Sequence, residues 1–174
     1  MTRQSGARAK SNGAEFEDYL DRVVFKAALD SGYFARIDKQ NPTYVATRSR
    51  AGVTFKPRAA SGADWIALGG PACQWEYIAI EAKHSDDPTL ARSRIEPNQS
   101  RHLASVAGAD QLAVILVSFS LNPGAAVFAM RWSESLFKKS GNGRSLSMAD
   151  CPDSNRITHF RDLDEILGSW QRLA

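Results

Sequence analysis

Cysteine is scarce in this 174-residue sequence, which contains only Cys73 and Cys151, far apart in loop-like contexts. Two such residues form neither a disulfide framework nor the closely spaced pattern of a metal site. No run of about eighteen apolar residues is present, so no membrane span is expected. The first thirteen residues, MTRQSGARAKSNG, lack the apolar segment of a secretory signal. We therefore expect a protein of the reducing cytoplasm.

The signatures of several enzyme classes are also missing. No glycine-rich phosphate loop precedes a helix, which argues against an NTPase. Ser118 and Ser120 have no nucleophile-elbow context, and His159 has no companion at metal-ligand spacing. The sequence therefore points away from ATP hydrolysis and from serine-hydrolase chemistry.

Acidic residues are nearly absent from two segments, although the net charge of the whole chain is only +3. Residues 1–12 contain three cations and no acid, and residues 36–58 contain six cations against the single acid Asp38. The cations of the second segment are Arg36, Lys39, Arg48, Arg50, Lys56 and Arg58. Basic runs of this kind suit a polyanion such as nucleic acid. From charge alone, a solvated surface with a disordered tail is an equal alternative.

Hydrophobic periodicity predicts one α/β domain over residues 13–174, preceded by a flexible basic arm at 1–12. Helices are expected at 12–31, 97–107, 133–139 and 161–173, and strands at 33–38, 63–68, 75–83, 111–121 and 125–132. Residues 40–60, 84–95 and 140–157 are expected to be irregular, apart from a strand fragment at 53–55. Strands 63–68 and 75–83, separated by a GGPACQ turn, should form an antiparallel hairpin.

The second strand of this hairpin is apolar but ends in Glu81 and Lys83. Residues i and i+2 of a strand share a face, so these two side chains point the same way. Asp64 lies at the start of the first strand, which an antiparallel hairpin places beside the end of the second. We therefore expect Asp64, Glu81 and Lys83 to meet at one end of the sheet.

Two adjacent carboxylates repel each other unless a cation lies between them. Mg²⁺ binds proteins through one or two carboxylates and completes its shell with waters and phosphate oxygens. Such a metal can activate water and stabilise the charge that develops on a phosphodiester, and Lys83 adds a point charge. The alternative is a simple strand-end ion pair of Lys83 with Glu81 or Asp64, because the E-x-K tripeptide is common.

Asp64 followed by Glu81-Ala82-Lys83 resembles the D…(D/E)xK core of the PD-(D/E)xK nuclease superfamily. Segments in the same order resemble RecU-type Holliday junction resolvases: GAEFE at 13–17, IDKQNPT at 37–43, ADWIAL at 63–68, IEAKHS at 80–85, NQSRHL at 98–103 and LAVILVSFS at 112–120. The proline of the superfamily name is absent, since Ser61-Gly62-Ala63 precedes Asp64, and residues after 133 do not match.

The resemblance implies a single-domain, restriction-endonuclease-like α/β fold with a central mixed sheet flanked by helices. Asp64 and Glu81 would hold Mg²⁺, for which Mn²⁺ could substitute, and Lys83 would be the catalytic lysine. Gln99 would help position water or DNA, and Glu17 would approach the metal directly or through water. Without the resemblance, Glu17 is equally a solvated helix carboxylate, and Gln99 an ordinary first-turn residue.

The resemblance also implies a cytoplasmic homodimer, of a bacterial cell or of a phage, that resolves four-way junctions or other branched DNA in recombination and repair. The basic segment 46–60 looks like the projecting stalk of this family. Phosphate contacts would then come from Lys39, Arg48, Arg50, Lys56 and Arg58. Two alternatives stay open: another nuclease of the same superfamily, such as a restriction or repair enzyme, and a non-catalytic DNA-binding protein.

Overall fold

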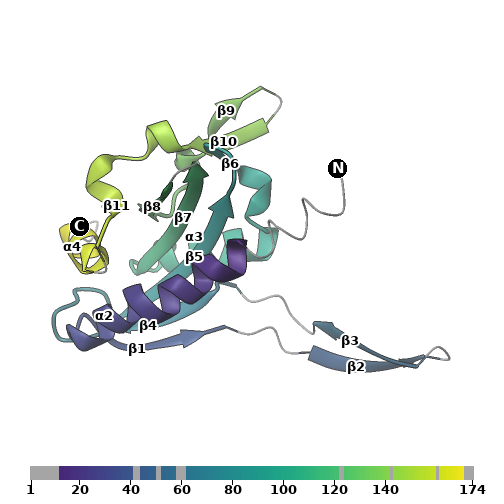
Figure 1. The fold of residues 1–174 in the computed structure, drawn as a ribbon. Helices are drawn as coiled ribbons and strands as arrows, with labels where there is room; N and C mark the ends of the chain where they lie inside the picture. The colour runs from purple at the N-terminus through teal and green to yellow at the C-terminus, as the bar shows by residue number, and fades with distance from the viewer. Residues whose placement is uncertain are drawn as a thin grey trace.

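The computed structural model describes residues 12–40, 44–49, 52–57, 62–121, 124–141, 143–159 and 161–170. Its centre is a mixed six-stranded sheet in the order β1-β4-β5-β7-β8-β11. Helices cover both faces of this sheet (Figure 1). The α/β class with a central mixed sheet flanked by helices is thereby confirmed.

The strands of the central sheet are β1 (Phe34–Lys39), β4 (Trp65–Gly69), β5 (Tyr77–Ser85), β7 (Leu112–Leu121), β8 (Gly124–Arg131) and β11 (Arg156–Ile157). A small second sheet contains β6 (Thr89–Ala91), β10 (Gly143–Ser147) and β9 (Lys138–Ser140), and β2 (Tyr44–Ser49) pairs with β3 (Gly52–Pro57). The helical elements are residues 12–19, η1 (Leu20–Phe25), α2 (Lys26–Asp30), η2 (Arg92–Arg94), α3 (Pro97–Gly108), η3 (Glu134–Leu136), η4 (Met148–Asp150), η5 (Asp153–Asn155) and α4 (Asp162–Ser169).

β5 occupies the middle of the central sheet, antiparallel to β4 and parallel to β7. Ile78 and Ile80 point into the core under the first helix, whereas Ala79 points into the core under α3. This alternation follows from the two-residue period of a strand, and the nearly continuous apolar sequence fits a strand covered on both faces. The expected antiparallel hairpin of β4 and β5 is confirmed.

The first helix is continuous from residue 12 to Asp30 and confirms the helix expected at 12–31. Its buried side chains Leu20, Val24 and Ala28 recur at four-residue steps and pack on one face of the sheet together with α4. The helix ends before Gly32, whose positive φ of 74° suits glycine. Within the described ranges, no helix combines the length and the apolar composition needed to cross a membrane.

Three segments expected to be irregular contain strands among their described residues. Residues 40–60 contain the β2–β3 hairpin, which stands away from the central sheet (Figure 1). Residues 84–95 and 140–157 contribute β6 and β10, which pair with each other across the sequence. The strand fragment expected at 53–55 is confirmed, because it lies within β3. The other strands were missed because strands of three to six residues are too short to show a clear period, and because two of them find partners far away in the chain.

Two expected helices are shorter in the structure. Residues 133–139 contain only the single turn η3, capped by Ser133, whose hydroxyl accepts a hydrogen bond from the Ser135 amide at 3.2 Å. Lys138 and the residues after it instead form β9, because they pair with β10. The helix expected at 161–173 is observed as α4, and residues 171–174 lie outside the described part of the chain.

Candidate functional site

The pairing of β4 with β5 places Asp64 beside the end of the apolar strand. Trp65 is opposite Ile80, and the Asp64 amide donates to the Ile80 carbonyl at 3.0 Å. The Asp64 Oδ2 atom accepts a hydrogen bond from the Ala82 amide at 2.9 Å. Asp64 is therefore held between the two residues that flank Glu81, as the hairpin geometry predicts.

Glu81 is completely buried, with an exposed fraction of 0%. Its Oε1 atom forms an ion pair with the Lys83 ammonium and accepts a hydrogen bond from Gln99 Nε2 at 2.5 Å. Its Oε2 atom is also buried and accepts from no donor group among the described residues, whereas the Asp64 carboxyl can share a hydrogen bond with Glu81 only when one of the two acids is protonated. The strand-end ion pair thus exists, but it uses only one of the two carboxylate oxygens.

The surroundings of Glu81 oppose its ionisation. Burial raises the pKa of Glu81 to about 8, and the neighbouring Asp64 carboxylate contributes to the increase, while the Lys83 ammonium acts in the opposite direction. At neutral pH the isolated site therefore favours a protonated Glu81. A further positive charge near Oε2 would be needed to make the ionised form stable.

A divalent cation fits this donor set. Asp64 and Glu81 offer hard carboxylate oxygens, and Oε2 of Glu81 is a buried acceptor that lacks a partner. The described residues contain no group of three or more His, Cys, Asp and Glu side chains that could hold a metal. The protein would therefore supply two carboxylates, and waters or phosphate oxygens would complete the shell, which is the arrangement that Mg²⁺ prefers.

Gln99 reaches Glu81 from the first turn of α3. The helix begins with Pro97, and Glu96 and Gln99 form a capping box in which the Glu96 amide donates to Gln99 Oε1 at 2.9 Å. The other end of the same amide, Nε2, donates to Glu81. The structure thus brings Gln99, Asp64, Glu81 and Lys83 together, while their chemical roles remain predictions.

Glu17 and Lys39, two other residues singled out in the sequence, contact each other instead. Lys39 Nζ lies 2.9 Å from Glu17 Oε2 and 3.2 Å from Asp21 Oδ2. It also lies 4.9 Å from the centre of the Trp65 ring, whose Nε1 donates to Asp21 Oδ1 at 2.7 Å. Partial burial disfavours the charged amine, but the hydrogen bonds to Glu17 and Asp21 raise the pKa of Lys39 overall. A metal contact for Glu17 and a DNA contact for Lys39 remain predictions.

The remaining predicted DNA contacts belong to the segment around the β2–β3 hairpin. Arg48 and Lys56 lie on β2 and β3, which are described by their backbone. Arg50 and Arg58 lie outside the described residues. The hairpin stands where the stalk-like segment was expected, and its contact with DNA remains a prediction.

Gly62, which no sequence motif singled out, controls how closely the chain at residue 62 packs on α3. A Cβ atom at Gly62 would lie 2.5 Å from Cγ and 2.7 Å from Cβ of His102. These atoms belong to the base of the His102 side chain, which cannot swing away as a flexible tip could. Only glycine therefore allows the loop to approach α3 this closely.

We expect Gly62→Ala to destabilise the fold by about 1–3 kcal/mol, the usual effect of overpacking. Gly108→Ala is a matched control, because a Cβ atom there meets nothing within 4 Å. Chemical denaturation of the two variants measures the difference. Equal stabilities would show that the loop before Asp64 adjusts freely to the added methyl group.

His84 forms a second polar network at the end of β5. Its Nδ1 atom lies 3.3 Å from Ser118 Oγ, and its Nε2 atom lies 3.1 Å from Asp86 Oδ1, which also accepts from Asn12 Nδ2 at 3.0 Å. Ser118 is only 3% exposed, so this Ser-His-Asp chain has no accessible nucleophile. The network instead ties the strand that carries Glu81 and Lys83 to the start of the first helix.

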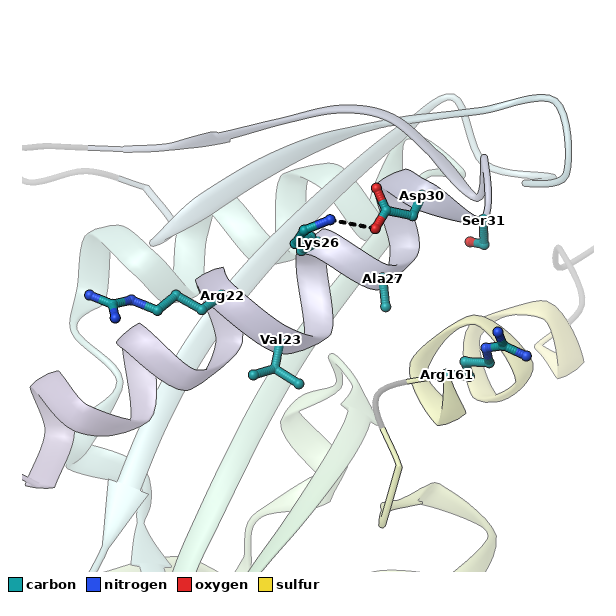
Figure 2. Close-up of a pocket in the computed structure, with 7 residues that line it drawn as sticks. All are labelled: Arg22, Val23, Lys26, Ala27, Asp30, Ser31 and Arg161. Carbon is teal, nitrogen blue, oxygen red and sulfur yellow. Dashed lines mark hydrogen bonds and ion pairs between the residues drawn. The ribbon is translucent and has the colours of Figure 1, made fainter.

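A groove of about 500 Å³ lies on the first helix next to the start of α4 (Figure 2). It is lined by Arg22, Val23, Lys26, Ala27, Asp30, Ser31 and Arg161. Lys26 pairs with Asp30 at 2.6 Å, and Arg22 pairs with Asp18 at 2.8 Å. None of the lining residues belongs to the carboxylate site.

Comparison with known proteins yields matches among solved structures only. No protein-family model and no curated protein sequence matches the chain. Among solved structures, the chain is similar to Archaeoglobus fulgidus Hjc, a Holliday junction resolvase from an archaeal hyperthermophile, with a TM-score of 0.47 and 16% sequence identity. The match covers 88% of this chain and 96% of that chain. At this level the likeness concerns the path of the backbone and says nothing about what this chain does.

Proposed function

We propose that the protein is a Mg²⁺-dependent, structure-selective endonuclease of the PD-(D/E)xK superfamily that cuts branched DNA. The observation that supports this proposal best is the buried Glu81, which shares its site with Asp64 and Lys83 and has one oxygen without a partner. A stability-driven ion pair would satisfy both oxygens, because an unpaired buried acceptor costs free energy. A site that must bind a cation keeps such an oxygen available.

Each residue has a distinct task in the proposed reaction. Asp64 and Glu81 hold the metal, and Gln99 fixes the orientation of Glu81 from α3. When bound, the metal supplies a Lewis acid that activates water and stabilises negative charge on the phosphate. Lys83 is held near the metal site by its ion pair with Glu81. Its positive charge would stabilise the negative charge of the scissile phosphate. Glu17 would support the metal only after releasing Lys39, with which it is paired here.

The substrate and the assembly belong to the same proposal. The basic segment around β2–β3, with Lys39, Arg48, Arg50, Lys56 and Arg58, would contact phosphates of a four-way junction. Contacts to phosphate carry little sequence information, so branch geometry would select the substrate. A homodimer would place two sites on opposed strands, as in RecU-type resolvases.

Cleavage of a mobile four-way junction and of a linear duplex with the same sequence tests the function. We expect Mg²⁺-dependent, paired nicks in the junction and little cutting of the duplex, with Mn²⁺ able to replace Mg²⁺. Equal cutting of both substrates would indicate another nuclease of the superfamily. Binding of the junction without cleavage in either metal would indicate a non-catalytic DNA-binding protein.

A further inference from the structure

We propose that Arg94, assisted by Arg101, forms a second phosphate-binding site beside the carboxylate site. It would hold the sugar-phosphate backbone next to the scissile phosphate, and it is separate from the basic segment around β2–β3. The inference rests on the proposed nuclease function, because it takes the ligand to be a DNA phosphodiester.

The exposed cations of the described chain differ in their charge balance. Most exposed cations of the described chain have a carboxylate partner, as in the pairs Arg22–Asp18, Lys26–Asp30, Arg36–Asp38 and Lys138–Asp150. Four other cations, Arg94, Arg101, Lys139 and Arg156, are exposed as well, but no carboxylate within 4 Å pairs with any of them in the part of the chain that the structure describes, so their positions decide which of them can serve the carboxylate site. Their positive charge is therefore not neutralised by the protein itself.

Arg94 lies next to the strand that carries the carboxylate site. It ends the turn η2, which connects β6 to α3, and its Nη2 atom donates to the His84 carbonyl at 3.1 Å. His84 directly follows Lys83 on β5. The Arg94 guanidinium is thus hydrogen-bonded to the end of β5, the strand that carries Glu81 and Lys83.

Arg101 lies on α3, the helix that follows Arg94 in the chain. Its Nε atom donates to the Pro97 carbonyl at 3.3 Å, so its guanidinium lies against the first turn of α3. That turn also carries Gln99, which contacts Glu81. Arg101 does not share the helix face of Gln99, because residues two apart on a helix point to different sides, so it can assist Arg94 only from the outer side of α3.

The chemistry of the guanidinium matches a phosphodiester. It has five N–H donors in a planar fork that can bind two phosphate oxygens at once. Each of the two arginines uses one donor for a backbone carbonyl, which leaves the others for a ligand. The carbonyl bond also restricts the side chain before DNA arrives, which lowers the entropic cost of binding.

Arg92, in the same turn as Arg94, does not serve this purpose. It donates from Nη2 to Glu134 Oε1 at 2.6 Å and lies 5.4 Å from the centre of the Trp132 ring. Its guanidinium is therefore part of the packing of η2 against η3 and the neighbouring Trp132. Arg92 is therefore a structural arginine, whereas Arg94 keeps N–H donors for DNA.

The test measures junction binding of Arg94→Ala over a range of salt concentrations, with Mg²⁺ omitted so that no cleavage occurs. We expect affinity to fall roughly tenfold, as for the loss of a charge-assisted hydrogen bond, and the salt slope to decrease by about 1. Arg156→Ala is the matched control, because Arg156 is exposed on β11, at the sheet edge opposite β1, and its binding curve should equal that of the wild type. Arg94→Lys should recover part of the affinity, and Arg101→Ala should show a smaller loss than Arg94→Ala.

The outcomes separate the inference from the function on which it rests. If the wild type binds and cuts junctions but Arg94→Ala and Arg156→Ala bind alike, the second phosphate site does not exist and the proposed function stands. If the wild type neither binds nor cuts branched DNA, the function itself is wrong. Circular dichroism of Arg94→Ala and Arg94→Lys shows whether both variants are folded, and a folded Arg94→Ala with an unchanged salt slope contradicts the proposal.

Discussion

Glu81→Gln should abolish cleavage of branched DNA while leaving junction binding unchanged. Glutamine keeps the shape of the side chain and can still accept from Gln99, but it removes the negative charge that would bind the metal. Removal of a partner that only supports a metal ligand typically lowers activity about 10- to 100-fold. Loss of the metal ligand itself should lower the cleavage rate by more than this range. Asp64→Asn should behave in the same way.

The readouts are the cleavage rate at saturating Mg²⁺ and the junction affinity without Mg²⁺. Glu76→Gln is the matched control, because Glu76 lies in the same hairpin but is exposed, and its cleavage rate should equal that of the wild type. A Glu81→Gln variant that cuts at the wild-type rate would disprove the metal role of Glu81. Loss of both binding and cleavage in a folded variant would place Glu81 in DNA recognition instead.

Metal-free protein should become less stable as the pH rises from about 4.5 to about 8, because Glu81 ionises. The Glu81→Gln variant should lack this loss of stability. The pKa of Glu81 is raised to about 8 in the folded protein by burial, with a contribution from Asp64, whereas an unfolded glutamate titrates near 4.3. Between these values the folded state binds more protons than the unfolded state, so the free energy of unfolding falls with pH. One pKa unit corresponds to about 1.4 kcal/mol, so the loss accumulates to several kcal/mol.

The measurement is urea denaturation in a chelator at several pH values, for the wild type, Glu81→Gln and the control Glu76→Gln. The difference in the free energy of unfolding between the wild type and Glu81→Gln should grow up to about pH 8 and then stay constant. Mg²⁺ should stabilise the wild type at pH 8 but not Glu81→Gln, because a ligand that binds only the folded state raises its stability. A difference that does not change with pH would contradict the raised pKa of Glu81.

Short-range geometry made the core of the site predictable. The two-residue period put Glu81 and Lys83 on one face, and a hairpin closed by a short loop fixed Asp64 beside them. The apolar residues around Glu81 predicted a buried strand, and burial is the main cause of its raised pKa. Proline at the start of α3 marked the turn from which Gln99 reaches the strand.

Long-range packing was not predictable in the same way. The sequence placed Glu17 on a helix but could not show that Lys39 would lie within 2.9 Å of its carboxylate. Nor could it show that β6 and β10, separated by more than fifty residues, pair beside the site. Gly62 was missed because its importance depends on a contact with His102, which lies on another element.

The double use of the Gln99 amide has a consequence for motion at the site. The first turn of a helix normally frays easily, because its amides lack partners within the helix. In α3 the carboxamide that closes this turn also holds the buried carboxylate. Each opening of the turn therefore releases Glu81 from a neutral donor and leaves it with Lys83 alone. We therefore expect opening of the first turn of α3 and reorientation of Glu81 to be coupled.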